Sequence, residues 1–308
     1  MSASGGRPGG AEERESPVLI ARLIAEPDHL SANCASALEA IAAQGGRAEA
    51  EALDFAGGVQ FSVEGLTPDA LRAVVDLHFQ PSDLLLSDHV PQVPALFVSD
   101  MDSTMIDAEC IDELADFAGI KHQIAAITER AMQGELDFES ALRERVLLLR
   151  DLSEGAIAEC LATRIAPIAG ARVLVETLKA HGCRTVLVTG GFHQFADPVA
   201  EQLGFERVVG NRLEVANGSL TGGLVGPITD SAVKKAVLLE ELAALPGGKS
   251  LATGDGANDI PMLEAATYGI AYRAKPKARA AADGWIDRGD LTSVLHLLGI
   301  ARDRWVLD

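Results

Sequence analysis

The chain of 308 residues carries 26 basic side chains (Lys and Arg) and 45 acidic ones (Asp and Glu), which gives a formal net charge of −19. This charge argues against a protein that binds nucleic acid or an anionic membrane, because the mean field of the protein repels polyanions. A hydrophobic fraction of 48% in a chain of this length suffices for one large or two medium folded domains. Any phosphorylated ligand would need a strong local positive site.

The first 16 residues are rich in Gly, Ser and Glu and contain no apolar run, which predicts a disordered tail over 1–16 rather than a secretory signal. No run of about 18 uncharged apolar residues follows, so we expect no transmembrane helix. The four cysteines lie far apart and form no Cys-x-x-Cys pair, a pattern typical of reduced thiols in a cytoplasmic protein.

Residues 17–90 are expected to form a small α+β domain. Its pattern predicts a strand, a helix, a hairpin and a second helix, at Val18–Ala25, Leu30–Ala43, Arg47–Gly65 and from Pro68 onward. Thr67 suits the N-cap of the second helix. Because this segment holds no catalytic cluster, it favours a regulatory or interaction role. The three prolines between Pro81 and Pro94 predict a linker.

The remainder, 93–308, has the pattern of an α/β domain with a parallel sheet. Four short apolar runs predict buried strands, at Ala95–Val98, Thr185–Val188, Leu251–Thr253 and Gly269–Tyr272. Helical patterns separate these runs, at Arg172–His181, Asp197–Leu203, Ser231–Leu245 and Pro261–Ala266. Ligands of such sheets bind beyond the carboxyl ends of the strands. All four predicted ends carry polar or glycine residues.

One connection is too long for a simple crossover. The chain advances 89 positions from Asp100 to Thr189, whereas a whole strand–helix–strand unit needs about 30 residues. The excess, about 108–165, is strongly helical, with segments at Ile111–Ala118, Ile124–Met132, Phe138–Leu149 and Glu154–Thr163. We interpret it as an inserted helical cap that closes over the strand ends and excludes water from the chemistry.

Acidic side chains follow two of the predicted strands. Asp100 and Asp102 come directly after the first strand, and Asp255 and Asp259 come after the third. Several carboxylates converging without Cys or His form a hard oxygen site, for which Mg²⁺ is the natural ion. Without a cation, such close like charges would raise one another's pKa values.

Three other motif interpretations fail on single positions. An EF-hand calcium loop would need Gly at Met105 and Glu at Ile111. A dinucleotide-binding Gly-x-Gly-x-x-Gly would need its third glycine at Asp259. A P-loop ending at Gly248-Lys249-Ser250 would need its first glycine at Ala243.

Two further features suit a phosphate site. Thr189 follows the second strand together with Gly190 and Gly191, and its hydroxyl and the adjacent backbone N–H groups can grip phosphate oxygens. Lys234 lies near the start of a predicted helix before the third strand, where its ammonium can neutralise phosphate charge.

These segments together resemble the haloacid dehalogenase (HAD)-like hydrolases, and within them the phosphoserine phosphatase family. The resemblance rests on the motifs DMDSTMIDAEC from Asp100, VTGGF from Val188, Lys234, and GDGANDIPML from Gly254. Thr189 stands where the family usually has serine, but it keeps the hydroxyl. The resemblance implies a Rossmann-like core with an inserted cap, and the first 90 residues distantly resemble small ACT-like regulatory domains.

The resemblance also implies residue roles. Asp100 would be the nucleophile and Asp102 the general acid/base. Magnesium would be held by Asp100, by Asp102 through its backbone carbonyl, and by Asp255 and Asp259. Phosphate would be bound by Thr189, Gly190, Lys234 and Asn258. In the cap, Glu109 would bind the substrate ammonium and Arg145 its carboxylate.

The expected reaction is Mg²⁺-dependent hydrolysis of O-phospho-L-serine, the last step of serine biosynthesis, in the cytoplasm. A homodimer is one assembly compatible with this expectation. One alternative is a sibling phosphatase for phosphothreonine or homoserine phosphate. Another is a non-enzymatic phospho-acceptor, which would lack the Asp102 acid/base and the helical cap. A third hypothesis is that the N-terminal domain binds an amino acid and regulates the enzyme.

Overall fold

One large sheet runs through the computed structural model, which describes residues 18–133 and 135–307. The expected tail, 1–16, lies outside the described residues. Within them, ten strands pair in the order β2 (Arg47–Ala52), β3 (Gly58–Glu64), β1 (Leu19–Ile24), β4 (Asp83–Ser87), β12 (Gly284–Ile286), β11 (Tyr268–Tyr272), β10 (Ser250–Gly254), β5 (Leu96–Ser99), β6 (Arg184–Phe192) and β7 (Arg207–Asn211).

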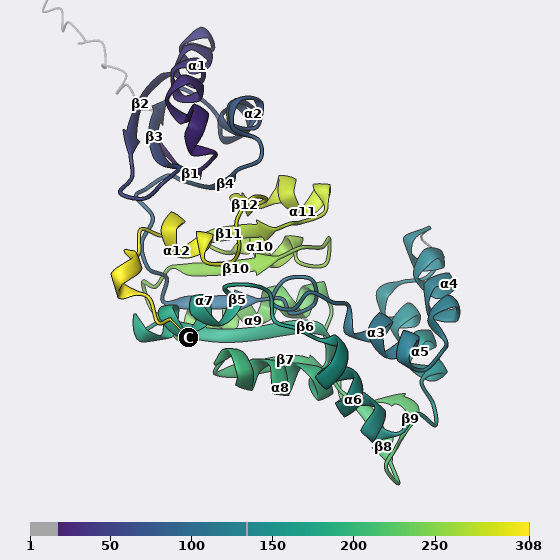
Figure 1. Ribbon diagram of the computed structural model, residues 1–308. Helices are drawn as coiled ribbons and strands as arrows, with labels where there is room; N and C mark the ends of the chain where they lie inside the picture. Colours follow the sequence, from purple (N-terminus) through teal and green to yellow (C-terminus); the bar gives the residue numbers. More distant parts are fainter. Residues whose placement is uncertain (1–17, 134, 308) are drawn as a thin grey trace, which may run out of the picture.

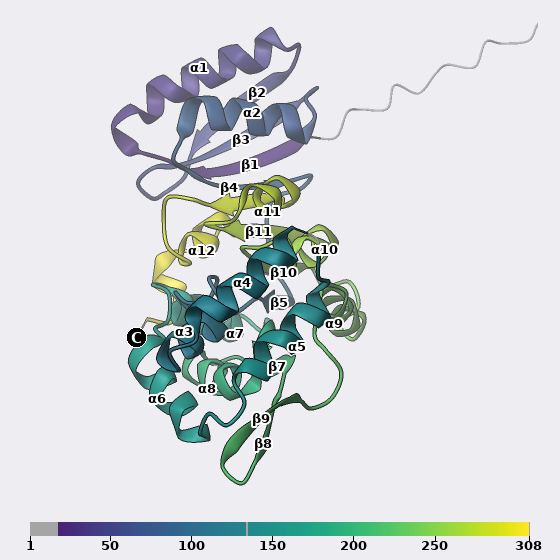
Figure 2. The same ribbon diagram turned by 90° about the vertical axis from the view of Figure 1, so that its right-hand side faces the viewer.

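The six strands from β12 to β7 are mutually parallel, which confirms the predicted α/β core. Each face of the sheet is covered by helices (Figures 1 and 2). On one face lie α7 (Ala171–Ala180), α8 (His193–Leu203) and α12 (Ser293–Leu297). On the other lie α9 (Ser231–Ala243) and α10 (Ile260–Ala265). Alternate residues of β5 pack into the two cores, Phe97 into the first and Val98 into the second.

The strands β1 to β4, with their two helices, span residues 19–87 and are called the N-terminal half of the sheet below. They have the order β1-α1-β2-β3-α2-β4, the ferredoxin-like βαββαβ arrangement. Helices α1 (Leu30–Ala43) and α2 (Pro68–Phe79) share a sheet face with α9 and α10. The Thr67 side chain caps α2 by accepting a hydrogen bond from the Ala70 N–H at 3.2 Å, as expected. The topology agrees with the predicted small α+β unit, and the ACT-like assignment stays a prediction.

Part of the expected linker over 81–94 is a strand instead. Strand β4 pairs antiparallel with both β1 and β12, and it joins the two halves into one sheet. Its first four residues are buried. The prolines Pro81, Pro91 and Pro94 flank this strand and lie outside it. The prediction of a linker was wrong because prolines that bound a strand were taken as a sign that the whole segment is irregular.

The cap contains the four predicted helices, α3 (Cys110–Phe117), α4 (Lys121–Met132), α5 (Phe138–Leu148) and α6 (Glu154–Arg164). Helices α4 and α5 lie beyond the carboxyl ends of the parallel strands (Figure 1). The sequence did not predict the hairpin of β8 (Leu213–Ala216) and β9 (Ser219–Leu224), which packs against α5. A Cβ atom on Gly222 would lie only 3.3 Å from the Leu147 Cα of α5, so hairpin and helix are in close contact.

Two boundaries near the predicted phosphate loop differ from expectation. Strand β6 continues past Val188 to Phe192, with an irregular register against β7 between these residues. Helix α8 begins at His193 and contains Pro198, whereas the sequence predicted a helix over Asp197–Leu203. In the described part of the chain, no helix has the length and apolar character needed to cross a membrane.

Candidate active site

The carboxylates that the sequence places after two different strands meet at one edge of the sheet. Strands β5 and β10 pair directly, with the Asp100 N–H donating to the Thr253 carbonyl at 3.0 Å. Below this edge the Thr253 hydroxyl donates to the Ser99 hydroxyl at 2.8 Å, which ties the two strand ends together. One ligand atom from each of Asp100, Asp255 and Asp259 lies within 4.8 Å of the others. The edge is a topological switch point, where α/β sheets bind ligands.

Lys234 links these carboxylates from below. It projects from the first turn of α9, and its Nζ lies 2.7 Å from Asp100 Oδ1 and 2.7 Å from Asp259 Oδ1. The residue is only 1% exposed. Burial acts to lower the pKa of Lys234, but the two carboxylates outweigh it and raise the pKa. The ammonium therefore stays charged in the site.

The orientation of Asp100 leaves one carboxylate oxygen available. Oδ1 accepts both the contact from Lys234 and a hydrogen bond from the Met101 N–H at 2.7 Å. Oδ2 receives no hydrogen bond from the residues that the structure describes. Burial and the charge of Asp259 raise the pKa of Asp100 well above its usual value. A positive charge placed among these acids would counteract that rise.

Asp102 lies close by with a different protonation preference. Its carboxylate accepts a hydrogen bond from the Cys110 N–H at 3.2 Å. Burial, followed by the charge of Glu109, raises the pKa of Asp102 to about 7. A carboxyl group with this pKa can donate a proton and take one up near neutral pH. The left-handed turn at Ser103 (φ 55°) brings the Ser103 hydroxyl to Glu109 Oε1 at 2.8 Å.

The segment Thr189–Gly191 faces the carboxylates from β6. The Thr189 hydroxyl, 1% exposed as a residue, accepts a hydrogen bond from the Gly191 N–H at 2.8 Å. Asn211 of β7 fixes the segment from behind. Its Nδ2 donates to the Gly190 carbonyl at 2.8 Å, and its Oδ1 accepts from the Thr229 N–H at 2.9 Å. The sequence missed Asn211, since only pairing between β6 and β7 reveals its position.

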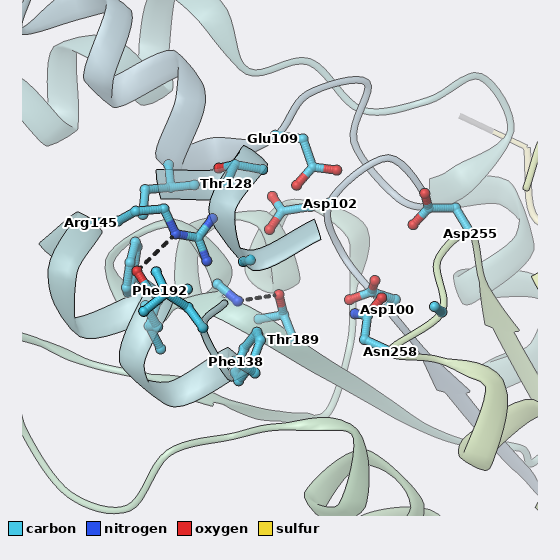
Figure 3. A pocket seen from close by; sticks show the side chains of 18 of the residues that line it. Asp100, Asp102, Glu109, Thr128, Phe138, Arg145, Thr189, Phe192, Asp255 and Asn258 are labelled. Carbon is cyan, nitrogen blue, oxygen red and sulfur yellow. Dashed lines mark hydrogen bonds between the residues drawn. The ribbon is translucent and has the colours of Figure 1, made fainter. Parts of the chain in front are cut away.

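A cavity of about 480 Å³ separates core and cap, and most predicted site residues line it (Figure 3). They are Asp100, Asp102, Glu109, Arg145, Thr189, Gly190, Asp255 and Asn258. Lys234 and Asp259 are buried below its floor, and Lys234 contacts both Asp100 and Asp259. The structure therefore brings all ten predicted residues together, while their individual roles stay predictions.

The cap side of the cavity holds residues that the sequence did not single out. Thr128 of α4 and Phe138 of α5 line it beside Arg145. A Cβ on Gly190 would lie 3.3 Å from the Phe138 ring, so cap and core are close here. Lys275, which follows β11, lines the cavity on the core side. The helical spacing Phe138–Leu142–Arg145 places these three side chains on one face of α5 and could have indicated Phe138.

The donor set fits the expected magnesium ion. Asp100, Asp255 and Asp259 offer only carboxylate oxygens, the ligands that Mg²⁺ prefers. Burial and the charge of Asp259 raise the pKa of Asp100, and a bound cation would counteract that rise. The Asp102 carboxylate does not belong to this group among the described residues. Its backbone carbonyl was the atom expected to bind the cation, and that stays a prediction.

Comparisons with known proteins agree with this geometry. Residues 97–264 match the model of the haloacid dehalogenase-like hydrolase family. A phosphoserine phosphatase of Idiomarina loihiensis is 45% identical over 206 residues, which cover 66% of this chain and 93% of that protein.

Solved structures extend the likeness to the fold. The unliganded crystal structure of a probable phosphoserine phosphatase from Vibrio cholerae superposes with a TM-score of 0.72 at 32% identity, covering 94% of this chain and 88% of that one. A phosphoserine phosphatase solved as a phospho-aspartyl intermediate analogue gives a TM-score of 0.60 at 38% identity, covering 67% and 99%. The chain therefore belongs to the haloacid dehalogenase-like hydrolases and, among them, to the phosphoserine phosphatase family.

Proposed function

We propose that this enzyme hydrolyses O-phospho-L-serine to L-serine and phosphate through an aspartyl-phosphate on Asp100. The observation that carries the proposal is the arrangement of three groups. Asp100 Oδ2 is free of hydrogen bonds from the described residues, Lys234 holds Oδ1 at 2.7 Å, and Asp102, with a pKa of about 7, lines the same cavity. The relative solved as a phospho-aspartyl intermediate analogue supports this chemistry.

In the first half-reaction, Asp100 Oδ2 attacks the phosphorus atom in line with the serine oxygen. A bond forms between Oδ2 and phosphorus, and the bond between phosphorus and the serine oxygen breaks. Asp102 in its protonated form gives its proton to the departing oxygen, and serine leaves as the neutral alcohol. Lys234 holds Oδ1 throughout, so the nucleophile keeps its orientation.

In the second half-reaction, water attacks the phosphorus of the aspartyl-phosphate. Asp102, now a carboxylate, takes the proton from this water, and the bond between phosphorus and Oδ2 breaks. Phosphate leaves, and both aspartates return to their starting states. The Thr189 hydroxyl and the backbone N–H groups beside it would hold the phosphoryl oxygens.

When bound by Asp100, Asp255 and Asp259, Mg²⁺ would neutralise phosphoryl charge and polarise the phosphorus–oxygen bonds. Asp259 also has a structural task, since its carboxylate accepts hydrogen bonds from the backbone N–H groups of Asp255 and Gly256 at 3.2 and 3.0 Å. These bonds shape the loop that carries Asp255.

The cap would select the amino acid part of the substrate. Glu109 lies where it can pair with the substrate ammonium, and the Arg145 guanidinium, whose Nε donates to the Ala141 carbonyl at 3.3 Å, faces the cavity for the substrate carboxylate (Figure 3). Cavity size alone does not separate phosphoserine from its near relatives, so hydrolysis of phosphothreonine or homoserine phosphate is the second candidate function. A cytoplasmic location, a homodimer and a regulatory role of the N-terminal half stay predictions.

The test is a phosphate-release assay over small phosphomonoesters, with Mg²⁺ and after its removal by a chelator. We expect multiple turnovers on O-phosphoserine, slower turnover on phosphothreonine and homoserine phosphate, and loss of activity without the metal. Asp100→Asn should lower kcat by several orders of magnitude, because amide nitrogen and oxygen are poor nucleophiles. Circular dichroism should show that this variant stays folded.

Faster turnover on homoserine phosphate than on phosphoserine would favour the sibling function. A single turnover followed by a stable phosphoprotein would favour the phospho-acceptor regulator. Normal phosphate release by Asp100→Asn would refute the assignment of the nucleophile.

A further inference from the structure

The cavity has an unfavourable charge for the substrate proposed above. Four carboxylates line it, from Asp100, Asp102, Glu109 and Asp255. The cations that line it within the described chain are Arg145 and Lys275. The whole chain has a formal net charge of −19, so the mean field of the protein repels a phosphate dianion before it reaches the cavity. A cation that faces solvent at the mouth would weaken this repulsion locally.

Two of the three cations in or near the cavity, Lys234 and Arg145, already have partners or a proposed task. Lys234 is 1% exposed and lies 2.7 Å from both Asp100 and Asp259, so it acts only on a group that has reached the floor. Arg145 is half-buried on the cap helix α5, on the side assigned to the substrate carboxylate. Neither is freely reached from bulk solvent.

Lys275 differs from both. Its side chain is 65% exposed, and its Nζ makes one long contact, 3.5 Å, with Asp255 Oδ2. The ion pair is weak because the distance is long and the lysine faces solvent, although the Asp255 side chain is only 11% exposed. The ammonium can therefore leave Asp255 for a stronger anion at small cost. Its backbone is fixed, because the Lys275 N–H donates to the Asp255 carbonyl at 2.9 Å. The chain thus anchors the backbone of Lys275 beside the reacting carboxylates while its charged end reaches solvent.

We propose that Lys275 is the substrate-capturing cation of this site: its ammonium draws the phosphate group of an anionic substrate into the cavity and holds it beside Asp255 before Asp100 attacks. The inference rests on the proposed function for the nature of the substrate. It requires no covalent step. Its consequence is a role in KM and in the rate of association, with a small role in kcat.

The test compares Lys275→Ala and Lys275→Arg with Lys277→Ala. Lys277 lies two residues further on, in α11 (Pro276–Ala281), is exposed and does not line the cavity. Both alanine variants remove one positive charge from the same short segment, so they match in net charge. The measurements are kcat and KM for O-phosphoserine at low and high salt, and inhibition by inorganic phosphate.

For Lys275→Ala we expect KM and the phosphate inhibition constant to rise about 3- to 10-fold, with kcat lowered less than about twofold. The fall of kcat/KM with salt should become shallower, because the screened attraction has been removed. Lys275→Arg should restore most of the affinity, and Lys277→Ala should behave as the unmodified enzyme.

A loss confined to kcat in Lys275→Ala would overturn the proposal, because it would show that Lys275 acts by orienting Asp255. Equal effects of the two alanine variants would overturn it as well, since net charge alone would then explain them. Failure of the proposed function is recognised separately: the unmodified enzyme would not hydrolyse phosphoserine. The comparison then uses whichever phosphomonoester is turned over.

Discussion

Gly191 lies between Asp102, the proposed general acid/base, and the Thr189 hydroxyl, which is proposed to bind phosphate, and its missing side chain leaves room for both. A Cβ at this position would lie 2.8 Å from Asp102 Oδ2 and 3.1 Å from Thr189 Oγ1. The first distance is shorter than real Cβ contacts allow, so Asp102 would have to move. The glycine is needed here for close approach, and its backbone φ is not in the left-handed region.

Gly191→Ala should therefore lower kcat by about 10²-fold, the cost expected when a catalytic group is displaced by about 1 Å. The melting temperature should change less than the activity, because the nearest atom is the end of the Asp102 side chain, which can move. Gly155→Ala is the control, since Gly155 lies in α6 and a Cβ there meets only Ser153 Oγ at 3.9 Å. This control should keep normal kcat, and alanine should slightly favour the helix. Full activity in Gly191→Ala would show that Asp102 tolerates displacement.

At the residue scale, the sequence predicted the side chains that carry formal charge or stand in a recognisable motif. Asp100 and Asp255 followed from their places after apolar runs, and Lys234 from its place in the series. Two residues that support others were not predicted. Asn211 and Ser99 bear ordinary polar groups, and their roles depend on partners 21 and 154 positions away along the chain. No local pattern encodes such pairs.

At the scale of elements, α2 and α11 form a polar link between the two halves of the molecule. Arg279 of α11 holds Asp76 of α2 through two hydrogen bonds, at 2.7 and 3.1 Å. Its guanidinium also lies 3.6 Å from the centre of the Trp285 ring and bonds Asp287 at 2.7 Å. Burial acts to raise the pKa of Asp76, but hydrogen bonds from Arg279 and Gln80 outweigh it and lower the pKa.

This lowered pKa predicts the pH dependence of the link. A carboxylate whose pKa is lower in the folded state stabilises the fold above its unfolded pKa, and the gain disappears as the pH falls through the folded pKa. Asp76→Asn should cost about 1 kcal/mol near pH 7, as for a partly exposed bidentate pair. At a pH below the lowered pKa of Asp76, the variant and the unmodified protein should converge.

Urea unfolding at these two pH values measures the difference. Glu39→Gln serves as the control, since it removes an exposed negative charge from α1 and should change the free energy of unfolding by less than about 0.5 kcal/mol at either pH. A constant difference between Asp76→Asn and the unmodified protein across the pH range would show that the pair's charge is irrelevant.

Elements were predicted from sequence when their signal was local and long enough. The bounds of α1 match the prediction, and the cap helices differ from it by at most three residues at either end, since each carries helical periodicity over two or more turns. Strand β12 has three residues and was missed, as was the hairpin β8–β9. Pairing with neighbours distant in sequence defines such short strands, and composition within them does not.

At the scale of the whole molecule, the β4–β12 pairing makes the two halves one sheet, and Asp83 reinforces the junction. This residue of β4 is fully buried, yet its carboxylate accepts hydrogen bonds from the N–H groups of Arg288 and Gly289 and from the Ser293 hydroxyl, at 2.7–3.1 Å. The N-terminal half thereby satisfies backbone donors of the core. Separating the halves would leave these donors and the carboxylate without partners.

The two halves should therefore unfold together, in a single calorimetric transition of the full chain. Asp83→Asn should lower the melting temperature of that whole transition, because the introduced NH₂ group faces N–H donors and about 2–3 kcal/mol of hydrogen bonding is lost. For a chain of 308 residues, with an unfolding entropy of about 2.1 cal/mol/K per residue, this corresponds to roughly 3–5 °C. Glu51→Gln, which removes an exposed charge from the outer strand β2, should leave the transition in place. Two separate transitions, with only the lower one moved by Asp83→Asn, would mean that the strands pair while the halves remain energetically independent.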